Sequence, residues 1–327
     1  MPSTTLVIGA TGAVGRPTVR ALLSDPGRNV RIFTRDPNGR QARALVEAGQ
    51  GRVSAATGSV DDEASLAAAT AGAEAVFCNT DFFSTASPLR EYEQGMRVLR
   101  AAQAAGVDHL VWSSLDNAAV LTDGRIPVPH YDAKGAVEAW IGLMRSEEFM
   151  REVQDGWFSH HVTVLVTGPY FENLQSFVLP QPGKLADGRE GMVFNIPLGA
   201  GHWPMIALDD IAWFARRVLD DRGQWGGRTL RVLSEALTGA EIAAAFERVT
   251  SIPAEYRDVP LDAVRASMPG IGQDMAAMWQ FFQDYDVIGR ERDMASLRSM
   301  HPELLRFEDW LRASDWRGEP AEVQKQA

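Results

Sequence analysis

A glycine-rich turn near the start of the chain constrains the fold more than any other feature. Apolar residues 6–8 lead into Gly9, Gly12 and Gly15, and a helical pattern follows at 16–23. The spacing is G-x-x-G-x-x-G, a variant of the dinucleotide-binding fingerprint with a longer first gap. We expect Gly9 to allow the sharp turn, Gly12 to let a ligand approach the backbone, and Gly15 to let helix and strand pack closely. Because backbone N–H groups at a helix N-terminus bind anions, the turn predicts a pyrophosphate site.

The charge balance excludes one class of function. The chain has 327 residues, a formal net charge of −11 and 45% hydrophobic residues. A field of that sign repels nucleic acid and anionic membranes, so we expect neither as a direct partner. The length suffices for one large or two modest domains with a buried core.

Cysteine usage and the N-terminus indicate a compartment. Cys78 is the only cysteine, which excludes an internal disulfide and a cysteine-based metal site. His160 and His161 have no nearby ligand set, so no metal site is predicted. No apolar run reaches transmembrane length, and the first predicted strand leaves no room for a cleaved signal peptide. We therefore expect a cytoplasmic protein.

Strands and helices alternate through the first half of the chain. Short apolar runs bounded by turn residues, typical of buried parallel strands, lie at 5–9, 30–34, 53–57, 75–79, 109–113 and 162–167. Helical patterns separate them at 13–23, 40–48, 63–71, 89–105 and 133–150. Repeated βα units predict the α/β class, with a Rossmann-type doubly wound parallel sheet.

The rhythm breaks after Gly168. Pro and Gly are frequent in 180–183 and 196–204, which we expect to be loops. Because this half cannot easily build its own sheet, we expect a smaller C-terminal α/β lobe over the carboxyl ends of the strands, with some elements returning to the first domain. The expected organisation is a Rossmann domain, a smaller substrate or partner lobe and a polar tail: 1–168, 169–316 and 317–327.

Three elements of the second half have recognisable signals. A helix is predicted at 209–219 with Asp209 as its N-cap. A strand is predicted at 229–233. A further helix is predicted at 238–249, opened by a capping box of Thr238 and Glu241.

The end of the second strand indicates the cofactor. Thr34, Arg35 and Asp36 stand roughly 20 residues after the glycines, where an acidic residue favours NAD and an arginine favours NADP. Arg35 comes first after the strand and could hold a 2′-phosphate, with Arg40 or Arg43 assisting. Asp36 is the competing signal, because turned inward it would repel that phosphate and accept the ribose hydroxyl of NAD. We predict NADP(H).

Three further stretches carry a family resemblance: Trp112-Ser113-Ser114-Leu115-Asp116-Asn117, His130-Tyr131-Asp132-Ala133-Lys134-Gly135 and Gly168-Pro169-Tyr170-Phe171-Glu172-Asn173-Leu174. With the glycine turn and Arg35, they resemble the NmrA-like family of atypical short-chain dehydrogenase/reductase relatives. The resemblance runs from Leu6 to about Trp310. The last stretch, followed by Leu179-Pro180-Gln181, is most similar to the human-type NADPH-sensor subgroup.

The resemblance implies a Rossmann domain and a small C-terminal domain with NADP(H) across the cleft between them. It implies that the glycine turn holds the pyrophosphate, Arg35 the 2′-phosphate and Lys134 the nicotinamide ribose. The residues expected to contact the cofactor are Gly9, Thr11, Gly12, Ala13, Val14, Gly15, Thr34, Arg35, Asn79, Thr80, Lys134, Pro169, Tyr170, Phe171 and Asn173.

The chain departs from ordinary short-chain dehydrogenases at their Tyr-x-x-x-Lys motif. His130 stands four residues before Lys134 and Tyr131 three before it, and on a helix both offsets fall roughly on the lysine's face. Candidate catalytic residues are Lys134, for proton delivery or oxyanion stabilisation, and His130 or Tyr131 as proton donor. Ser113, at the end of the fifth strand, could polarise a carbonyl or merely cap the strand.

Two functions from different classes remain open. The first, which we favour, is an NADPH-dependent reductase of an apolar carbonyl, enone, quinone or related small molecule. The second is a non-catalytic NADP(H) redox sensor that regulates a protein partner, and the missing Tyr-x-x-x-Lys motif favours it. A homodimer is left open. Aromatic residues that could line a substrate cleft, or equally pack the core between domains, are Phe82, Phe83, His202, Trp203, Trp279, Phe281 and Phe282.

Overall fold

The computed structural model describes residues 3–321 and contains the predicted Rossmann-type sheet. Seven parallel strands lie in the order β10-β6-β5-β4-β1-β2-β3. Their bounds are β1 (Ser3–Ile8), β2 (Arg28–Thr34), β3 (Val53–Thr57), β4 (Ala75–Cys78), β5 (His109–Ser114), β6 (Val162–Val166) and β10 (Thr229–Arg231). The strand order reverses between β1 and β4, which is the topological switch point where such sheets bind ligands. All seven strands confirm the sequence prediction.

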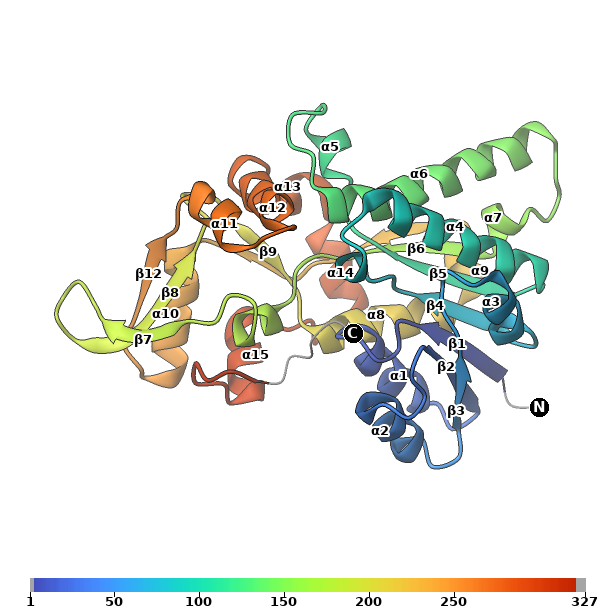
Figure 1. Ribbon diagram of the computed structural model, residues 1–327, viewed down its shortest axis with the longest axis horizontal. Helices are drawn as coiled ribbons and strands as arrows, with labels where there is room; N and C mark the ends of the chain where they lie inside the picture. The colour runs from blue at the N-terminus through green and yellow to red at the C-terminus, as the bar shows by residue number, and fades with distance from the viewer. Residues whose placement is uncertain (1–2, 322–327) are drawn as a thin grey trace.

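Helices cover both faces of this sheet (Figure 1). One face carries α1 (Gly15–Leu23), α2 (Arg40–Ala48) and α8 (Leu208–Leu219). The other carries α3 (Glu63–Thr70), α4 (Pro88–Ala104) and α6 (Pro129–Met150). Short helical turns occupy the connections: η1 (Phe82–Ser84), α5 (Ala118–Leu121), α7 (Trp157–His160), η2 (Phe171–Gln175) and α9 (Arg222–Trp225).

Successive strand side chains enter two different cores. On β1, Val7 joins the core under α1, α2 and α8, whereas Leu6 and Ile8 join the core under α3, α4 and α6. Because both faces of the sheet are covered, its strands are continuous apolar runs, and this is the pattern that located them in the sequence.

The smaller lobe builds sheets of its own, so the expectation that it could not is wrong. β7 (Gln181–Lys184), β8 (Glu190–Ile196) and β12 (Ala254–Asp258) form one sheet, and β9 (Trp203–Met205) pairs with β11 (Glu235–Leu237). The predicted loops at 180–183 and 196–204 therefore contribute residues to β7, β8 and β9. Pro182 and Pro204 misled the prediction: both lie in edge strands, where a missing N–H is tolerated.

Helices complete this lobe; most of them lie on the left of Figure 1, and α14 lies near the middle. They are α10 (Gly239–Thr250), α11 (Leu261–Ser267), α12 (Gly272–Asp284), α13 (Val287–Glu291), α14 (Met294–Met300) and α15 (Phe307–Ser314). The capping box predicted at Thr238 and Glu241 is confirmed at the start of α10. Asp209 as an N-cap is wrong: α8 begins after Ala207, and the carboxylate of Glu172, distant in sequence, accepts the N–H of Leu208.

Elements of the second half return to the first domain and join the two lobes. β10 pairs with β6 at the edge of the large sheet, and α8 packs against α1. Arg292, after α13, donates two hydrogen bonds to Asp116, after β5, with Nη1–Oδ1 at 3.0 Å and Nη2–Oδ2 at 2.8 Å. Both side chains are at most 2% exposed, so this bidentate pair fixes the smaller lobe against the end of β5.

The predicted polar tail is described only in part. Arg317 donates from Nη2 to the carbonyl oxygen of Thr250 at 2.8 Å, and residues 322–327 lie outside the described residues. Within 3–321, no helix is both long and apolar enough to cross a lipid bilayer.

Candidate functional site

The glycine turn lies at the switch point, between the ends of β1 and β4. Gly9 has φ +78°, and a Cβ there would lie 2.2 Å from the carbonyl oxygen of Asn79, which follows β4. A Cβ at Gly15 would lie 2.0 Å from the carbonyl oxygen of Gly9, so the start of α1 packs directly on the turn. A Cβ at Gly12 would lie 3.3 Å from the carbonyl oxygen of Gly9, and no other described atom lies within 4 Å of it. Gly12 therefore leaves one side of the turn open.

The N-terminus of α1 can accept an anion. Its N-cap, Val14, makes no side-chain capping bond, and the first turn of the helix contains no acidic residue. Ala13 and Val14 are buried, whereas Thr11 and Gly12 are partly exposed. The positive end of the helix dipole is therefore not compensated by a side chain of the helix itself, which suits a phosphate group.

Arg35 and Asp36 have different surroundings at the end of β2. The carboxylate of Asp36 accepts the N–H of Asn38 at 3.0 Å, and the hydroxyl of Thr34 accepts the N–H of Asp36 at 3.2 Å. Asp36 is thus engaged in the turn that leads to α2. Arg35 is exposed, and its charge acts on the carboxyl of Asp81, beyond β4. The charge of Arg35, at the carboxyl end of β2, therefore reaches the residues that follow β4.

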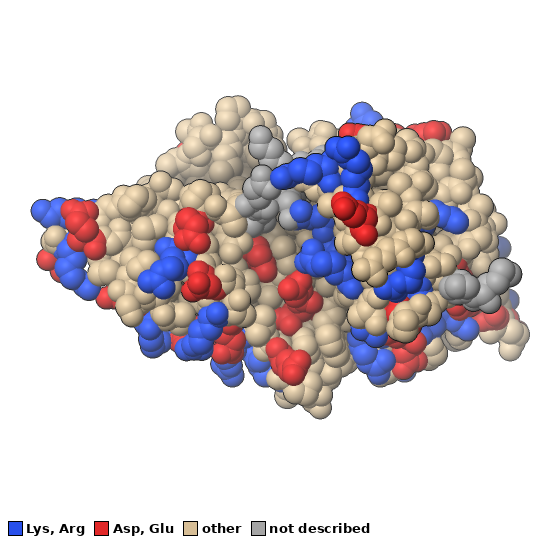
Figure 2. All heavy atoms as spheres, turned by 90° about the horizontal axis from the view of Figure 1, so that it is seen from below, with Lys and Arg blue, Asp and Glu red and all other residues tan. Residues whose placement is uncertain are grey.

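The segment around the turn is basic although the chain as a whole is acidic. Figure 2 shows Lys and Arg side chains to the right of the middle of the lower face, with Asp and Glu side chains among them. Such a local field attracts phosphorylated ligands. Against Asp25 and Asp36, residues 16–43 contain Arg16, Arg20, Arg28, Arg31, Arg35, Arg40 and Arg43, of which Arg20 pairs with Asp209 and Arg28 with Asp220.

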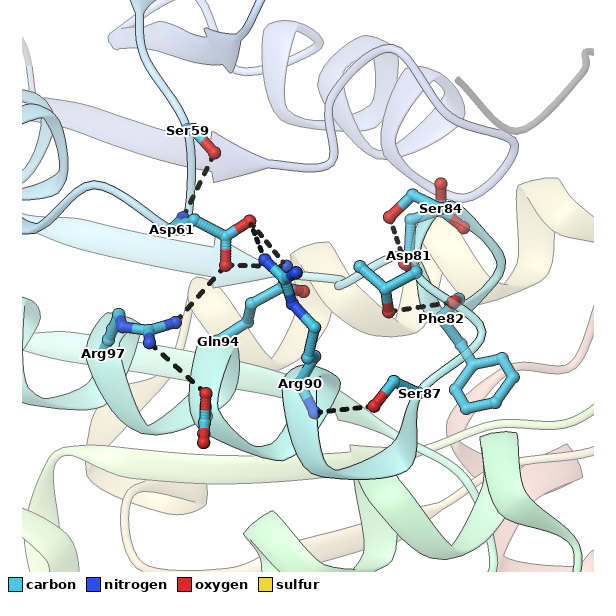
Figure 3. A network of polar contacts seen from close by, with 11 residues as sticks. Ser59, Asp61, Asp81, Phe82, Ser84, Ser87, Arg90, Gln94 and Arg97 are labelled. Carbon is cyan, nitrogen blue, oxygen red and sulfur yellow. Dashed lines mark hydrogen bonds and ion pairs between the residues drawn. The ribbon is translucent and has the colours of Figure 1, made fainter.

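Two polar networks hold the connections that follow β3 and β4 (Figure 3). Asp61, after β3, accepts hydrogen bonds from Gln94 at 3.2 Å and Arg97 at 3.4 Å, both on α4. Asp81 accepts the N–H of Phe83 at 3.1 Å and so starts η1. Its other carboxylate oxygen is buried and has no hydrogen-bond partner among residues 3–321, and burial raises the pKa of this group. One carboxylate oxygen of Asp81 can thus accept a further hydrogen bond.

Lys134, on α6, is tied to the residues that follow β4. Its Nζ lies 2.8 Å from the carbonyl oxygen of Thr80, 2.8 Å from the Thr80 hydroxyl and 2.8 Å from Oε1 of Glu91. Lys134 is 7% exposed and Glu91 is 0% exposed. An ammonium group has three N–H donors, and each has a protein acceptor here. Lys134 therefore fixes Thr80, and a ligand could bind its ammonium only by displacing one of these partners.

His130 lies one helical turn before Lys134 and contacts the smaller lobe. Its Nδ1 lies 2.8 Å from Oδ1 and 2.7 Å from Oδ2 of Asp274, on α12. Its backbone N–H donates to the same Oδ1 at 3.2 Å. The rings of Phe83 and Phe82 lie 5.3 and 5.8 Å from its ring, between centroids. The imidazole therefore stands where the aromatic residues after β4, α6 and α12 meet.

Tyr131 and Ser113 are both buried. The ring centroid of Tyr131 lies 4.8 Å from that of His130 and 6.1 Å from that of Phe281. Burial raises the pKa of Tyr131 well above its usual value, so the phenol stays protonated. Ser113 lies on β5 opposite Leu165 of β6. Their catalytic roles stay predictions.

Residues 169–173 connect β6 to the smaller lobe. Phe171 is fully buried and packs against Phe307 and Trp310, with centroids 5.4 and 5.7 Å apart, so its ring belongs to the core. Of the aromatic residues predicted for a substrate cleft, Phe82 is buried, Phe83 is half-buried and His202 is exposed. The buried core includes Trp203, Trp279, Phe281 and Phe282. Backbone hydrogen bonds are made by Pro169, Tyr170 and Asn173.

The same segment places a carboxyl group with a perturbed pKa between the two lobes. Glu172 accepts the N–H of Leu208 at 3.2 Å and the indole N–H of Trp310 at 3.0 Å. Burial raises its pKa from 4.5 to about 7. Between these two values the folded state binds more protons than the unfolded state, so this group lowers stability progressively as pH rises from 4.5 to about 7.

Glu172→Gln is therefore expected to stabilise the protein at pH 8 and to change little at pH 5. The gain at pH 8 should be roughly 1–3 kcal/mol, because the amide oxygen, in the place of Oε1, can still accept from both Leu208 and Trp310 without the cost of a buried charge. Thermal unfolding at the two pH values measures it, with the exposed Glu190→Gln as control. A variant whose melting temperature follows that of the wild type at both pH values would contradict the assignment.

Sequence patterns missed three charged residues of the site: Glu91, Asp274 and Asp81. Glu91 had a usable signal, because it lies in phase with Val98 and Ala102 on the buried side of α4. Asp274 had none, since its contact with His130 joins positions 144 residues apart.

The fold and the glycine turn define an α/β protein of the Rossmann type with a dinucleotide-type turn at its switch point. The model of the NmrA-like family matches residues 1–311, and the chain belongs to this family. The resemblance seen in the sequence is thereby confirmed.

Relatives and solved structures agree with this assignment. An NmrA-like family domain-containing oxidoreductase of Aspergillus hancockii is 30% identical over 273 residues, which are 80% of this chain and 77% of its own. The structure of NmrA, a negative transcriptional regulator, in complex with NADP matches with a TM-score of 0.72 at 20% identity, over 95% of each chain; NmrA is also known in complex with NAD. The NADPH-dependent quinone oxidoreductase of Escherichia coli, complexed with NADPH, matches with a TM-score of 0.70 at 20% identity, over 95% of this chain and 100% of its own.

Proposed function

We propose that this protein binds NADP(H) and uses it to reduce an apolar carbonyl, enone or quinone-type compound. One observation carries the proposal: a continuous series of contacts runs from the glycine turn to a histidine–carboxylate pair. Gly9 lies against Asn79, the next residue Thr80 binds Lys134, and His130 lies one turn before Lys134. An anion site and a group able to donate a proton are thus held in one framework.

The residues present fit a nicotinamide dinucleotide phosphate. The open side of the glycine turn suits the pyrophosphate, and the exposed Arg35 suits the 2′-phosphate. The unpartnered oxygen of Asp81 would accept a ribose hydroxyl. NmrA binds both NAD and NADP, so its likeness supports a nicotinamide cofactor without choosing between them. The engagement of Asp36 in its own turn favours NADP.

The chemistry divides between the cofactor and the protein. The cofactor, when bound, supplies a hydride. His130 supplies the proton that the reduced oxygen requires, because Asp274 occupies Nδ1 and leaves Nε2 as the ring nitrogen for the acceptor. Lys134 holds the end of β4 in place through Thr80. Tyr131, with its raised pKa, is a poorer proton donor at neutral pH.

The aromatic surroundings indicate the acceptor class. Rings of Phe82, Phe83 and Tyr131 flank the imidazole of His130. Such a setting favours a flat, apolar molecule over a charged one. The quinone oxidoreductase of Escherichia coli, which shares the fold, supports quinones within this class.

NADPH consumption by the purified protein across aldehydes, ketones, enones and quinones tests the proposal. Saturation with NADPH is confirmed first, and turnover is expected on at least one class. Tight NADPH binding without turnover on any class would overturn the reductase and support an NADP(H) redox sensor that regulates a protein partner. Absence of binding would overturn both.

Arg35→Ala is expected to reduce the preference for NADPH over NADH by about 10-fold to 100-fold, as the loss of a charge-assisted bond to phosphate predicts. The dissociation constant for NADH should change little, because that cofactor lacks the 2′-phosphate. Calorimetric titration with both cofactors measures the effect. Arg100→Ala, an exposed arginine on α4, is the control. An unchanged preference in Arg35→Ala would remove Arg35 from the phosphate site.

A further inference from the structure

We propose that Asp274 positions His130 as the proton donor, so that the smaller lobe completes an active site otherwise built by the Rossmann domain. The proposal rests on the reductase function proposed above. It starts from a single contact that joins α6 of one lobe to α12 of the other, between residues 144 positions apart.

The carboxylate of Asp274 is stabilised by the ends of two helices. Asp274 lies in the first turn of α12, and it accepts the backbone N–H of His130 in the first turn of α6. Backbone N–H groups at these positions have no partner within their own helices, and both helix dipoles favour an anion there. At 5% exposure, Oδ1 of Asp274 accepts hydrogen bonds from the backbone N–H and the ring of His130, whereas Oδ2 has no hydrogen-bond partner within residues 3–321. The backbone contact holds Asp274 in place independently of the imidazole.

The contact with the ring fixes which nitrogen of His130 meets an acceptor. A carboxylate only accepts hydrogen bonds, so Nδ1 of His130, 2.8 Å away, must carry a proton. Phe82, Phe83 and Tyr131 flank the ring, which is only 8% exposed and cannot turn over freely. Nε2 is left to face an acceptor. In the imidazolium form, Nε2 carries a proton as well.

The resulting step is balanced. The acceptor carbon gains a hydride from the reduced nicotinamide, the π bond of the carbonyl breaks, and the oxygen takes the Nε2 proton of His130. A C–H and an O–H bond form, the nicotinamide is oxidised, and the imidazole is left neutral with its remaining proton on Nδ1. Water then restores the proton on Nε2.

A dependence on the smaller lobe follows from this arrangement. Without α12, His130 would keep its position on α6 but lose the group that sets its tautomer. The buried Arg292–Asp116 pair holds the two lobes together near the same end of α6, since both charges act on Tyr131 in the first turn of that helix. Proton delivery therefore requires docked lobes.

Asp274→Asn tests the proposal with two independent readouts. Because the new amide can donate to Nδ1, the neutral ring should move its proton to Nε2. The 15N NMR spectrum of His130 should then change from a protonated to an unprotonated Nδ1. In the acceptor assay, kcat should fall by about 100-fold or more with KM for NADPH unchanged, the scale of a lost general acid. Asp284→Asn, an exposed residue on the same helix, should change neither readout.

A second variant keeps the test valid if Asp274→Asn folds poorly. His130→Gln keeps a donor for Asp274 but cannot transfer a proton, so a similar loss of kcat is expected in a protein that melts near the wild-type temperature. Wild-type kcat in either variant, or an unchanged His130 spectrum in Asp274→Asn, would overturn the proposal. A wild type without turnover on any acceptor would instead overturn the proposed function, and the NMR spectrum alone would then decide whether Asp274 orients the ring.

Discussion

Replacing Gly15 with valine is expected to prevent stable folding and with it NADPH binding. A Cβ at this position would lie 2.0 Å from the carbonyl oxygen of Gly9 and 2.6 Å from Cα of Ala10. Both are backbone atoms of the turn, so no side-chain rotation can relieve the clash, and α1 would have to leave β1. The loss should exceed about 4 kcal/mol, at the extreme for single substitutions. Urea denaturation followed by circular dichroism measures it.

Two other glycines provide matched controls for this result. In Gly12→Ala, the new Cβ would lie 3.3 Å from its nearest neighbour, so the free energy of unfolding should stay within about 1 kcal/mol of the wild-type value. The variant should still bind NADPH at least 10-fold more weakly, because the methyl group occupies the open side of the turn. Gly142→Ala, on α6, places its Cβ more than 4 Å from the other described residues and should stabilise by up to about 1 kcal/mol. Native stability in Gly15→Val, or undiminished binding in Gly12→Ala, would contradict the roles assigned to the turn.

The second large effect is expected at the buried pair of Lys134 and Glu91. Glu91→Leu leaves the ammonium of Lys134 buried without its counter-charge, and the cost should be about 3–5 kcal/mol. Lys134→Met should cost a similar amount, because it leaves the Glu91 carboxylate fully buried with one hydroxyl partner, Thr80. The double variant, an apolar pair, should recover most of the loss. A double-mutant cycle by chemical denaturation measures this coupling.

The control for this cycle lies on the same helix. Glu93 is exposed and pairs with Arg97 at 3.4 Å, and Glu93→Leu should cost less than about 1 kcal/mol, as exposed ion pairs do. Equal losses for Glu91→Leu and Glu93→Leu would show that the buried pair is not a unit. The same conclusion would follow if the double variant lost as much free energy of unfolding as the two single variants together.

The sequence predicted what local patterns encode. The glycine positions follow from backbone geometry within seven residues, and Arg35 follows from its place after a recognisable strand. The sheet was predicted because strands buried on both faces are continuous apolar runs. The edge strands β7 and β9 were missed because Pro182 and Pro204 are normally loop signals and are tolerated only where one side of a strand is unpaired.

The rest of the site depends on pairs that are distant in the chain. His130 and Lys134 were predicted from their spacing, but their partners Asp274 and Glu91 were not. A buried carboxylate is stable only beside a specific donor, and that donor is set by how helices pack in space. The wrong cap at Asp209 has the same origin, because the group that caps α8 is Glu172, over thirty residues earlier.

The return of β10 and α8 to the first domain restricts how the two lobes can move. Within residues 3–321 the chain passes between them three times: after β6, before α8 and after β10. A single linker would act as a hinge, whereas three separate tethers at different points resist rotation about any one axis. Ligand exchange should therefore proceed through local opening of connections such as η1, with the lobes keeping their mutual orientation throughout turnover.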